Sequence, residues 1–457
     1  MASPQSSLLY SPPLSELKGP SLGSFPLLYP FLSLASFGMI IFLRISISIL
    51  FLGLIDWYAY QAVKTAFGST LATRLIYWGL SGGMWLFLLV LVASFDRQSG
   101  PHDPLFKWYA GALTLLLVPK LILIIGLLGE DVLRFITGLV HKVSGSEGAF
   151  WPERRRVVSL IGLGLAAIPF AGILHGIWKG RYNYRVIRQT LYFPDLPAAF
   201  DGLRITQISD IHSGSFDNRE KIRYGIDLIN AQKSDLLLFT GDLVNSRAEE
   251  MEPWMKEFKR LKAPLGKYSI LGNHDYGDYV EWESPEAKEA NMQRLYAIEA
   301  ELGFDLLRNE NRRLSRGGDA IRLAGVENWS AGGVKKDGDL ETALEDLAPE
   351  DFTILLSHDP SHFDHQVVQH RQAVQLTLSG HTHGMQFGIE IPGWVKWSPV
   401  KYRYPRWAGL YQEAGRKLYV NRGFGFLAFP GRVGIWPEIT VLELRRGASP
   451  ASAKCLF

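Results

Sequence analysis

The stretch RITQISDIHS, residues 204 to 213, joins a short β-rich run to a carboxylate and an imidazole, Asp210 and His212. An apolar run of this length predicts a buried strand, and ligands of α/β sheets gather beyond the carboxyl ends of strands. Side chains two positions apart in an extended segment point to the same side. Asp210 and His212 could therefore bind one ion together, although such a pair taken alone is more often a chance meeting of a strand end and a polar loop.

Four later apolar runs end in the same way, with polar residues at Gly241 and Asp242, at Gly272 to Asp275, at Ser357 and His358, and at Gly380 to His383. Buried carboxylates and imidazoles without partners would cost several kcal/mol, and a divalent ion offsets that cost. The glycines in three of these runs allow sharp turns and a close approach to a bound group. The repeated pattern predicts a metal centre.

The order D-x-H, G-D, G-N-H-D, a lone histidine and G-H-x-H resembles the calcineurin-like metallophosphoesterase family, over roughly residues 203–444. The resemblance implies an α/β fold, an αββα sandwich of two mixed sheets flanked by helices. The N-terminal part of the chain is apolar. Together with the resemblance, it predicts a transmembrane helical bundle followed by a calcineurin-like domain. The implied activity is metal-dependent hydrolysis of phosphoesters, in which two ions activate water and neutralise the developing charge.

By position, the resemblance implies two metal ions with a shared ligand. One ion would be held by Asp210, His212 and His383, the other by Asn273, His358 and His381, with Asp242 bridging them. His274 would protonate the leaving oxygen or bind the phosphoryl group, and Asp275 could orient the imidazole. Mixed imidazole, amide and carboxylate ligands suit Mn, with Fe or Zn as alternatives, better than Ca. Asn245 departs from the aspartate that members often carry there, but this position is not a usual ligand.

Three further histidines, His362, His365 and His370, follow the lone-histidine motif. They could support the metal ligands from behind. A solvated helix face is the favoured interpretation for all three.

The chain has 457 residues, 47% of them hydrophobic, and a mean hydropathy of +0.04. These values indicate at least two structural units and a chain too apolar for a simple soluble enzyme. A run of about 20 apolar residues can span a bilayer, and the expected spans are Ile45–Val63, Ile76–Ala93, Trp108–Leu128 and Val157–Ile177. Phe25–Leu43 stays open between a further span, a re-entrant piece, and a pre-sequence with Met39 as the true start.

The expected organisation is a disordered leader (1–24), a transmembrane region of about four spans (25–178), a linker (179–202), the metallophosphoesterase domain (203–446) and a tail (447–457). A net charge of +3 is too mild to indicate nucleic acid as a partner. The expected partners are a membrane lipid and a phosphorylated, lipid-linked substrate. We expect an integral protein of the plasma or inner membrane, and basic residues on both sides of the last span leave the side of the domain open.

Periodicity within the domain predicts a helix over residues 217–231 and another that begins at Ser284 and Pro285. Later strands are expected at 321–326, 352–357, 376–379, 417–421 and 438–444. No internal repeat is visible.

Trp394 to Tyr411 interleaves aromatic and basic residues after the last metal motif. Two interpretations are equally favoured: a loop at an anionic membrane surface, or a packed aromatic lid. Membrane-tethered members of the family include pyrophosphatases that cleave UDP-2,3-diacylglucosamine, so a lipid-linked phosphodiester or pyrophosphate is the expected substrate. Other phosphodiesters or phosphomonoesters are the alternative, together with a non-catalytic metal-holding sensor, which should lack a ligand or His274.

Overall fold

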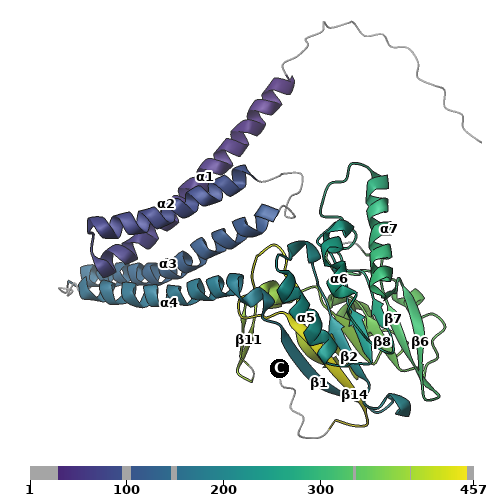
Figure 1. The fold of residues 1–457 in the computed structure, drawn as a ribbon. Helices are drawn as coiled ribbons and strands as arrows, with labels where there is room; N and C mark the ends of the chain where they lie inside the picture. Colours follow the sequence, from purple (N-terminus) through teal and green to yellow (C-terminus); the bar gives the residue numbers. More distant parts are fainter. Residues whose placement is uncertain (1–28, 95–103, 146–151, 333–335, 392, 450–457) are drawn as a thin grey trace, which may run out of the picture. The chain divides into compact units, whose positions relative to one another are not determined.

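The computed structural model describes residues 29–94, 104–145, 152–332, 336–391 and 393–449 (Figure 1). The chain divides into two compact units, residues 1–57 and 58–457. Four long helices come first: α1 (Tyr29–Phe67), α2 (Leu71–Ala93), α3 (Pro104–Ser144) and α4 (Pro152–Trp178). The expected leader and most of the expected tail lie outside the described residues.

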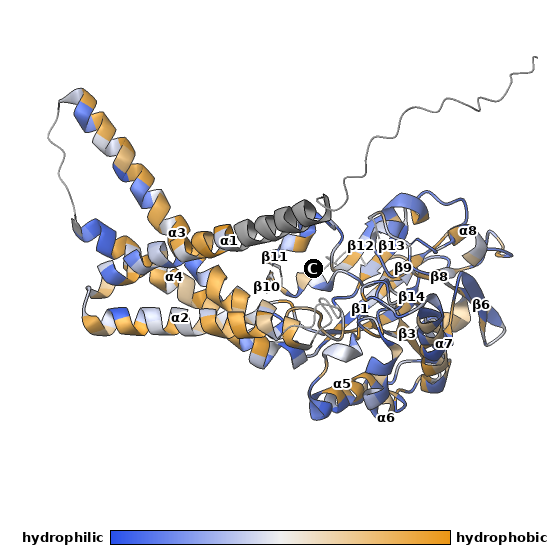
Figure 2. Ribbon diagram, turned by 90° about the horizontal axis from the view of Figure 1, so that it is seen from above, coloured by the Kyte–Doolittle hydropathy of each residue, from blue (hydrophilic) through white to orange (hydrophobic). Residues whose placement is uncertain are grey.

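Within the described residues, three helices are long and apolar enough to cross a membrane: Leu71–Ala93, Leu105–Ser144 and Glu153–Trp178. They contain the three expected spans that begin at residues 76, 108 and 157. Figure 2 shows hydrophobic residues along the length of α2. The first expected span, 45–63, lies within α1, so the total of about four spans stays a prediction. The chain is thus a membrane protein with an apolar helical N-terminal part.

The soluble domain contains two six-stranded mixed sheets. The first has the order β1-β14-β2-β3-β4-β5, and the second has the order β12-β13-β9-β8-β7-β6. The strands of the first sheet are β1 (Arg185–Phe193), β2 (Arg204–Ile208), β3 (Leu236–Phe239), β4 (Lys267–Ser269), β5 (Asp305–Leu306) and β14 (Glu438–Arg446). Those of the second are β6 (Glu310–Arg316), β7 (Asp319–Gly325), β8 (Thr353–Leu356), β9 (Leu376–Ser379), β12 (Gly409–Glu413) and β13 (Arg416–Val420).

Side chains of the central strands point alternately to the two faces of each sheet, and this explains how the two sheets and the helices form layers. Leu236 and Leu238 of β3 lie in the core between the sheets, whereas Leu237 faces the helices that cover the first sheet. On the second sheet Ile354 points into the core between the sheets and Leu355 points to the opposite side. Because neighbouring side chains of a strand point to opposite faces, runs that are apolar throughout produce the predicted αββα sandwich.

The helices of the domain are α5 (Arg219–Ala231), α6 (Met255–Phe258), α7 (Pro285–Leu302) and α8 (Leu340–Ala343). Short helical turns are η2 (Gly180–Tyr182), η3 (Ala198–Phe200), η4 (Ser213–Ser215), η5 (Ala248–Trp254), η6 (Phe363–Val367), η7 (His383–Gln386) and η8 (Pro399–Tyr402). The predicted start of α7 is confirmed, because the Ser284 side chain accepts a hydrogen bond from the Ala287 N–H at 3.2 Å, with Pro285 in the first turn. A two-stranded hairpin, β10 (Ile389–Ile391) and β11 (Val395–Trp397), completes the elements.

The stretch 179–202, expected to be a linker, is a structural part of the domain. Its strand β1 pairs in parallel with β14 over nine residues, from Arg185 opposite Glu438 to Phe193 opposite Arg446. The linker prediction was wrong here because the polar side chains of β1 conceal an edge strand whose inner positions, Leu191 and Phe193, are buried.

Candidate metal centre

Seven side chains converge at the ends of strands from both sheets. Asp210 and His212 follow β2, Asp242 follows β3, Asn273 follows β4, His358 follows β8, and His381 and His383 follow β9. All five of these strands run parallel to a neighbour within their sheet. Their carboxyl ends therefore meet at a common edge, where ligand sites of α/β sheets form.

The first group brings together three buried side chains, Asp210, His212 and His383. The Nε2 atoms of His212 and His383 lie 3.0 Å apart, and His383 Nε2 lies 3.2 Å from Asp210 Oδ1. One ligand atom from each of the three lies within 4.8 Å of the others. This spacing suits three donors around one ion.

The second group is centred on Asp242. Its Oδ2 atom lies 3.1 Å from His358 Nε2 and 3.5 Å from His212 Nε2, so this carboxylate faces both groups. Asp210, Asp242 and His358 also satisfy the 4.8 Å spacing. Asn273 Oδ1 and His381 Nδ1 lie 2.8 Å apart beside them.

The backbone at the site is held in an uncommon conformation. Five of the seven residues have φ between +48° and +70°: Asp210, His212, Asp242, His381 and His383. Residues other than glycine adopt this region rarely, and such strain persists only where surrounding structure enforces it. Gly272 shows the crowding, because an added Cβ would overlap the Asp242 carboxylate.

The donor set fits a divalent cation. Burial raises the pKa of Asp210 and Asp242, but the facing imidazoles, His383 for Asp210 and His358 for Asp242, outweigh it and leave both values below normal. Burial lowers the pKa of His212 and His381, so these rings are neutral and can donate a lone pair. Anionic carboxylates and neutral imidazoles are the forms that bind metal.

The pKa of His358 shows that the carboxylate of Asp242 attracts positive charge. Burial lowers its pKa, but the charge of Asp242 overcomes this and raises the pKa to about 10. His358 Nε2 is 3.1 Å from Asp242 Oδ2 without the alignment of a hydrogen bond. The ring nitrogen and the carboxylate oxygen are close but are not aligned for a shared proton. This arrangement suits two ligand atoms that bind the same cation.

His274 and Asp275 contribute differently from the expectation. His274 Nδ1 lies 2.8 Å from the carbonyl oxygen of Asn245, so this carbonyl orients the ring. Asp275 instead accepts 2.8 Å hydrogen bonds from the backbone N–H groups of Asp242, Leu243 and Gly272. The expectation that Asp275 orients the imidazole is therefore wrong: its carboxylate fixes the loops that carry Asp242 and Asn273.

Sequence reasoning did not single out three residues that contact this site. The Tyr404 hydroxyl lies 2.8 Å from His381 Nε2, and the Tyr279 hydroxyl accepts a 2.7 Å hydrogen bond from Asn273 Nδ2. The fully buried Arg432 places Nη2 3.2 Å from His383 Nδ1. Only Tyr404 carried a signal, its place in the aromatic and basic stretch. Tyr279 lies only six residues after Asn273, whereas Arg432 is brought in by a loop distant in sequence.

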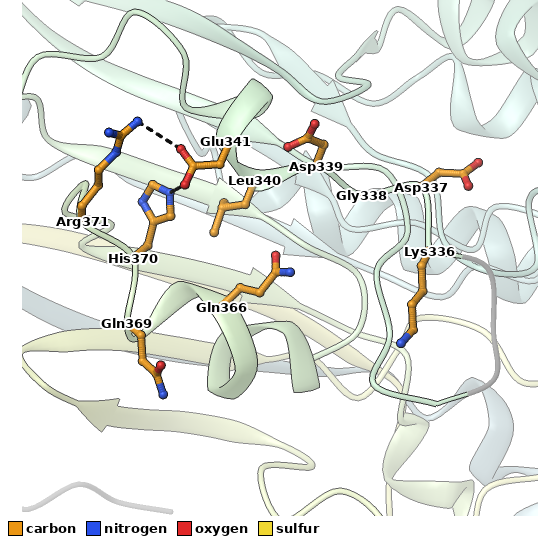
Figure 3. Close-up of a pocket in the computed structure, with 10 residues that line it drawn as sticks. All are labelled: Lys336, Asp337, Gly338, Asp339, Leu340, Glu341, Gln366, Gln369, His370 and Arg371. Atoms are coloured by element: carbon orange, nitrogen blue, oxygen red, sulfur yellow. Dashed lines mark hydrogen bonds and ion pairs between the residues drawn. The ribbon is translucent and has the colours of Figure 1, made fainter. Parts of the chain in front are cut away.

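The additional histidines do not share one environment. His362 is buried, contacts Ser357 Oγ through Nδ1 at 2.8 Å, and stacks on Trp329, so a solvated helix face is wrong for it. Figure 3 shows His370 in a separate surface depression, where His370 and Arg371 both pair with Glu341. None of the seven converging residues is among those that line this depression.

The aromatic and basic stretch has a buried part and an exposed part. Trp407 is buried against Ala408 and Ile435, which agrees with a packed lid. Trp394 and Tyr402 are 79% and 78% exposed, and a membrane surface stays a prediction for them.

Comparison with known proteins gives concordant matches. The family model described as the transmembrane domain of a probable calcineurin-like phosphoesterase matches residues 39–181, and the one described as calcineurin-like phosphoesterase matches residues 203–385. The uncharacterized metallophosphoesterase YkuE of Bacillus subtilis is 33% identical, over 55% of this chain and 82% of the relative.

The names of two further relatives refer to a membrane or to a lipid. The transmembrane protein with metallophosphoesterase domain of Bos taurus is 33% identical, over 55% of this chain and 54% of the relative. The UDP-2,3-diacylglucosamine pyrophosphatase LpxG of Chlamydia trachomatis is 30% identical, over 57% of this chain and 90% of the relative. The matches to the first and third relatives cover most of their length.

Proposed function

Because the chain belongs to the calcineurin-like metallophosphoesterases and is a metal-dependent phosphoester hydrolase, we propose that it hydrolyses a phosphodiester or pyrophosphate bond of a membrane lipid. One observation carries the lipid part of the proposal. The Arg432 backbone N–H donates to the Gly176 carbonyl of α4 at 3.2 Å, while its side chain lies 3.2 Å from His383. A single residue thus connects a candidate membrane span to a candidate metal ligand.

The proposed centre holds two divalent ions, Mn first, with Fe or Zn as alternatives. Asp210, His212 and His383 would hold one ion, and Asn273, His358 and His381 the other, with Asp242 shared between them. Such a pair of ions supplies a nucleophile from water at neutral pH and neutralises charge on the transferring phosphoryl group.

His274 is the proposed proton donor. A carbonyl oxygen can only accept, so the contact with Asn245 places a proton on His274 Nδ1. Burial lowers the pKa of this ring, against the raising effect of Asp242, so the ring is neutral and carries its lone pair on Nε2, the atom that takes up a proton. As the water oxygen bonds to phosphorus and the bond to the leaving oxygen breaks, the imidazolium gives this proton to the leaving oxygen.

The specific substrate that we propose is UDP-2,3-diacylglucosamine or a related lipid-linked nucleotide. LpxG of Chlamydia trachomatis, which is 30% identical over 57% of this chain, carries this substrate in its name. Hydrolysis of the pyrophosphate would give UMP and a lipid monophosphate: the water oxygen stays on the phosphorus that it attacks, and the former bridging oxygen stays on the other product, which takes up a proton. The plasma or inner membrane is the proposed location. Another phosphodiester or a phosphomonoester is the second candidate.

The test uses full-length protein reconstituted in vesicles with Mn. We expect UMP and lipid monophosphate to appear in equal amounts from UDP-2,3-diacylglucosamine, and to stop when the metal is chelated. A soluble p-nitrophenyl diester is the parallel substrate for the same preparation.

The parallel substrate separates two kinds of failure. Cleavage of the soluble diester without cleavage of the lipid would remove the lipid substrate and leave the phosphoesterase in place. Cleavage of neither by a metal-loaded preparation would contradict the site assignments as well.

A further inference from the structure

The hairpin β10–β11 has an inverted distribution of polar and apolar residues. Glu390 of β10 points inward, where it pairs with Arg422, which is only 3% exposed and also contacts Glu438. Its neighbours Ile389 and Ile391 point to the other side and are 52% and 43% exposed. An antiparallel pair that faced water would show the reverse pattern.

Other exposed apolar side chains lie in the turn of the hairpin and in the short helical turns that precede and follow it, η7 and η8. Trp394 lies in its turn, where its N–H donates to the Ile391 carbonyl at 3.0 Å. Met385 of η7 is 58% exposed, and Tyr402 belongs to η8, which packs against η7. We call the five side chains Met385, Ile389, Ile391, Trp394 and Tyr402 the hairpin face. Single exposed apolar residues need no explanation, but a cluster marks an interaction surface.

The base of the hairpin is fixed to α4 through one loop. Gly388 N–H donates to the Val433 carbonyl at 2.9 Å, and Val433 N–H donates to the Gln386 carbonyl at 2.7 Å. The preceding residue, Arg432, bonds to Gly176 of α4. Gly176 permits this contact, because a Cβ there would lie 2.7 Å from the Arg432 carbonyl oxygen.

These contacts place the hairpin base at the end of a candidate membrane span, as Figure 1 shows for β11 and α4. Trp178, the last residue of α4, is 76% exposed with Lys179 Nζ 4.9 Å from its ring. Exposed tryptophan next to a basic residue is typical of the membrane–water interface. On α3, a second candidate span, a Cβ at Gly111 would lie 2.8 Å from Pro430 of the same loop.

The charges next to the hairpin face suit lipid head groups. Lys401 and Arg403 are exposed and flank Tyr402 in sequence, and Lys401 Nζ lies 5.2 Å from the Tyr402 ring. Basic side chains near a bilayer are attracted to anionic lipids. Exposed apolar side chains next to basic ones, near the end of a candidate span, are suited to contact with the head-group layer of the bilayer.

We propose that the hairpin face inserts into the head-group region of the bilayer that α4 enters, and holds the metal centre at the depth of lipid phosphates. Both ends of the face connect directly to the site. Met385 is two residues from His383, and Tyr402 is two residues from Tyr404, whose hydroxyl contacts His381. The insertion itself does not depend on which phosphoester is hydrolysed.

Depth-dependent quenching tests this proposal on the full chain. Cys455 is the only cysteine, so Cys455→Ser gives a background for Trp394→Cys, each copy labelled with an environment-sensitive fluorophore. The vesicles contain phosphatidylcholine and phosphatidylglycerol. We expect nitroxide lipids labelled near the head group to quench this probe, at the depth of about 5–10 Å typical of interfacial insertion, and aqueous iodide to quench it weakly.

Two further variants keep the test decisive. Ser315→Cys places the same probe on β6, an edge strand of the second sheet, where iodide should quench and nitroxide lipids should not. Ile391→Cys gives a second position on the hairpin face if Trp394→Cys does not fold.

Two outcomes would overturn the proposal. Quenching by iodide alone at residues 391 and 394, as at residue 315, would show that the face is in water. Self-quenching between labelled copies without lipid quenching would show that it binds a second copy of this chain.

Discussion

Two pairs of buried carboxyl groups, Asp210 with Asp242 and Asp275 with Glu299, behave in opposite ways. Asp210 and Asp242 face imidazoles, which keep their pKa values below normal. Asp275 and Glu299 lie behind them, and burial raises their pKa values to about 7 and about 8, with Asp242 adding to the first and Asp275 to the second.

Burial acts on all four groups in the same direction, because a low-dielectric interior disfavours the charged form. The difference therefore comes from their partners. The imidazoles keep Asp210 and Asp242 anionic, the form that binds metal, and a cation in the site would have the same effect. In the second pair burial outweighs the partners, and Asp275 accepts hydrogen bonds from four backbone N–H groups.

The largest effect is expected from the shared carboxylate. Asp242→Asn removes the charge that faces both groups of ligands, so we expect both metal content and diester hydrolysis to fall, the latter by more than about 10⁴-fold, beyond the range of a lost general acid. Metal analysis and steady-state rates measure this. Asp346→Asn is the matched control, since Asp346 also has a positive φ, +60° against +62°, but is exposed. Similar losses in both variants would contradict the assignment.

A smaller loss is expected when the proton donor alone is removed. His274→Asn should retain the metals and lower hydrolysis of an alkyl diester by about 10²–10⁴-fold, as for other general acids. A p-nitrophenyl diester, whose leaving group needs no proton, should lose much less. Equal losses with both leaving groups would assign His274 to phosphoryl binding instead of proton transfer.

The smallest effect should appear in stability and not in chemistry. Glu299 has a folded-state pKa of about 8 against 4.5 for the free side chain. Its contribution to stability is therefore full below about pH 4.5 and lost as the pH rises through about 8, because the carboxylate must then be charged inside the core.

Glu299→Gln resembles the protonated form and should raise the unfolding temperature at pH 9 by about 2–8 °C, the shift that 1–2 kcal/mol gives in a domain of this size. At pH 5 the variant and the parent should unfold at closely similar temperatures. Glu301→Gln, on the exposed side of the same helix, should show no such dependence on pH. A Glu299→Gln effect of equal size at both pH values would point to packing as its cause.

Much of the site could be predicted from the sequence, because each ligand follows a strand whose apolar run is continuous and local. Strand ends such as Ile208 and Phe239 fix where Asp210 and Asp242 begin their loops, and parallel strands end at the same edge. The αββα class followed from the family resemblance, whereas the runs by themselves indicated only a layered α/β domain. The role of Asp275 was missed because adjacency in sequence to His274 does not determine which donors a carboxylate meets.

By itself, then, the sequence indicated which residues could bind metal, which helices are apolar enough to span a membrane, and where the buried central strands lie, since these depend on residue type and local period. Only the tertiary structure decided that β1 belongs to the sheet, that Asn245 and not Asp275 orients His274, and that Arg432 joins His383 to α4. Each of these is a contact between segments far apart in the chain or a choice among competing donors. Such contacts are selected by packing and by the cost of leaving buried polar groups unpaired. Neither can be predicted from the order of neighbouring residues in the sequence.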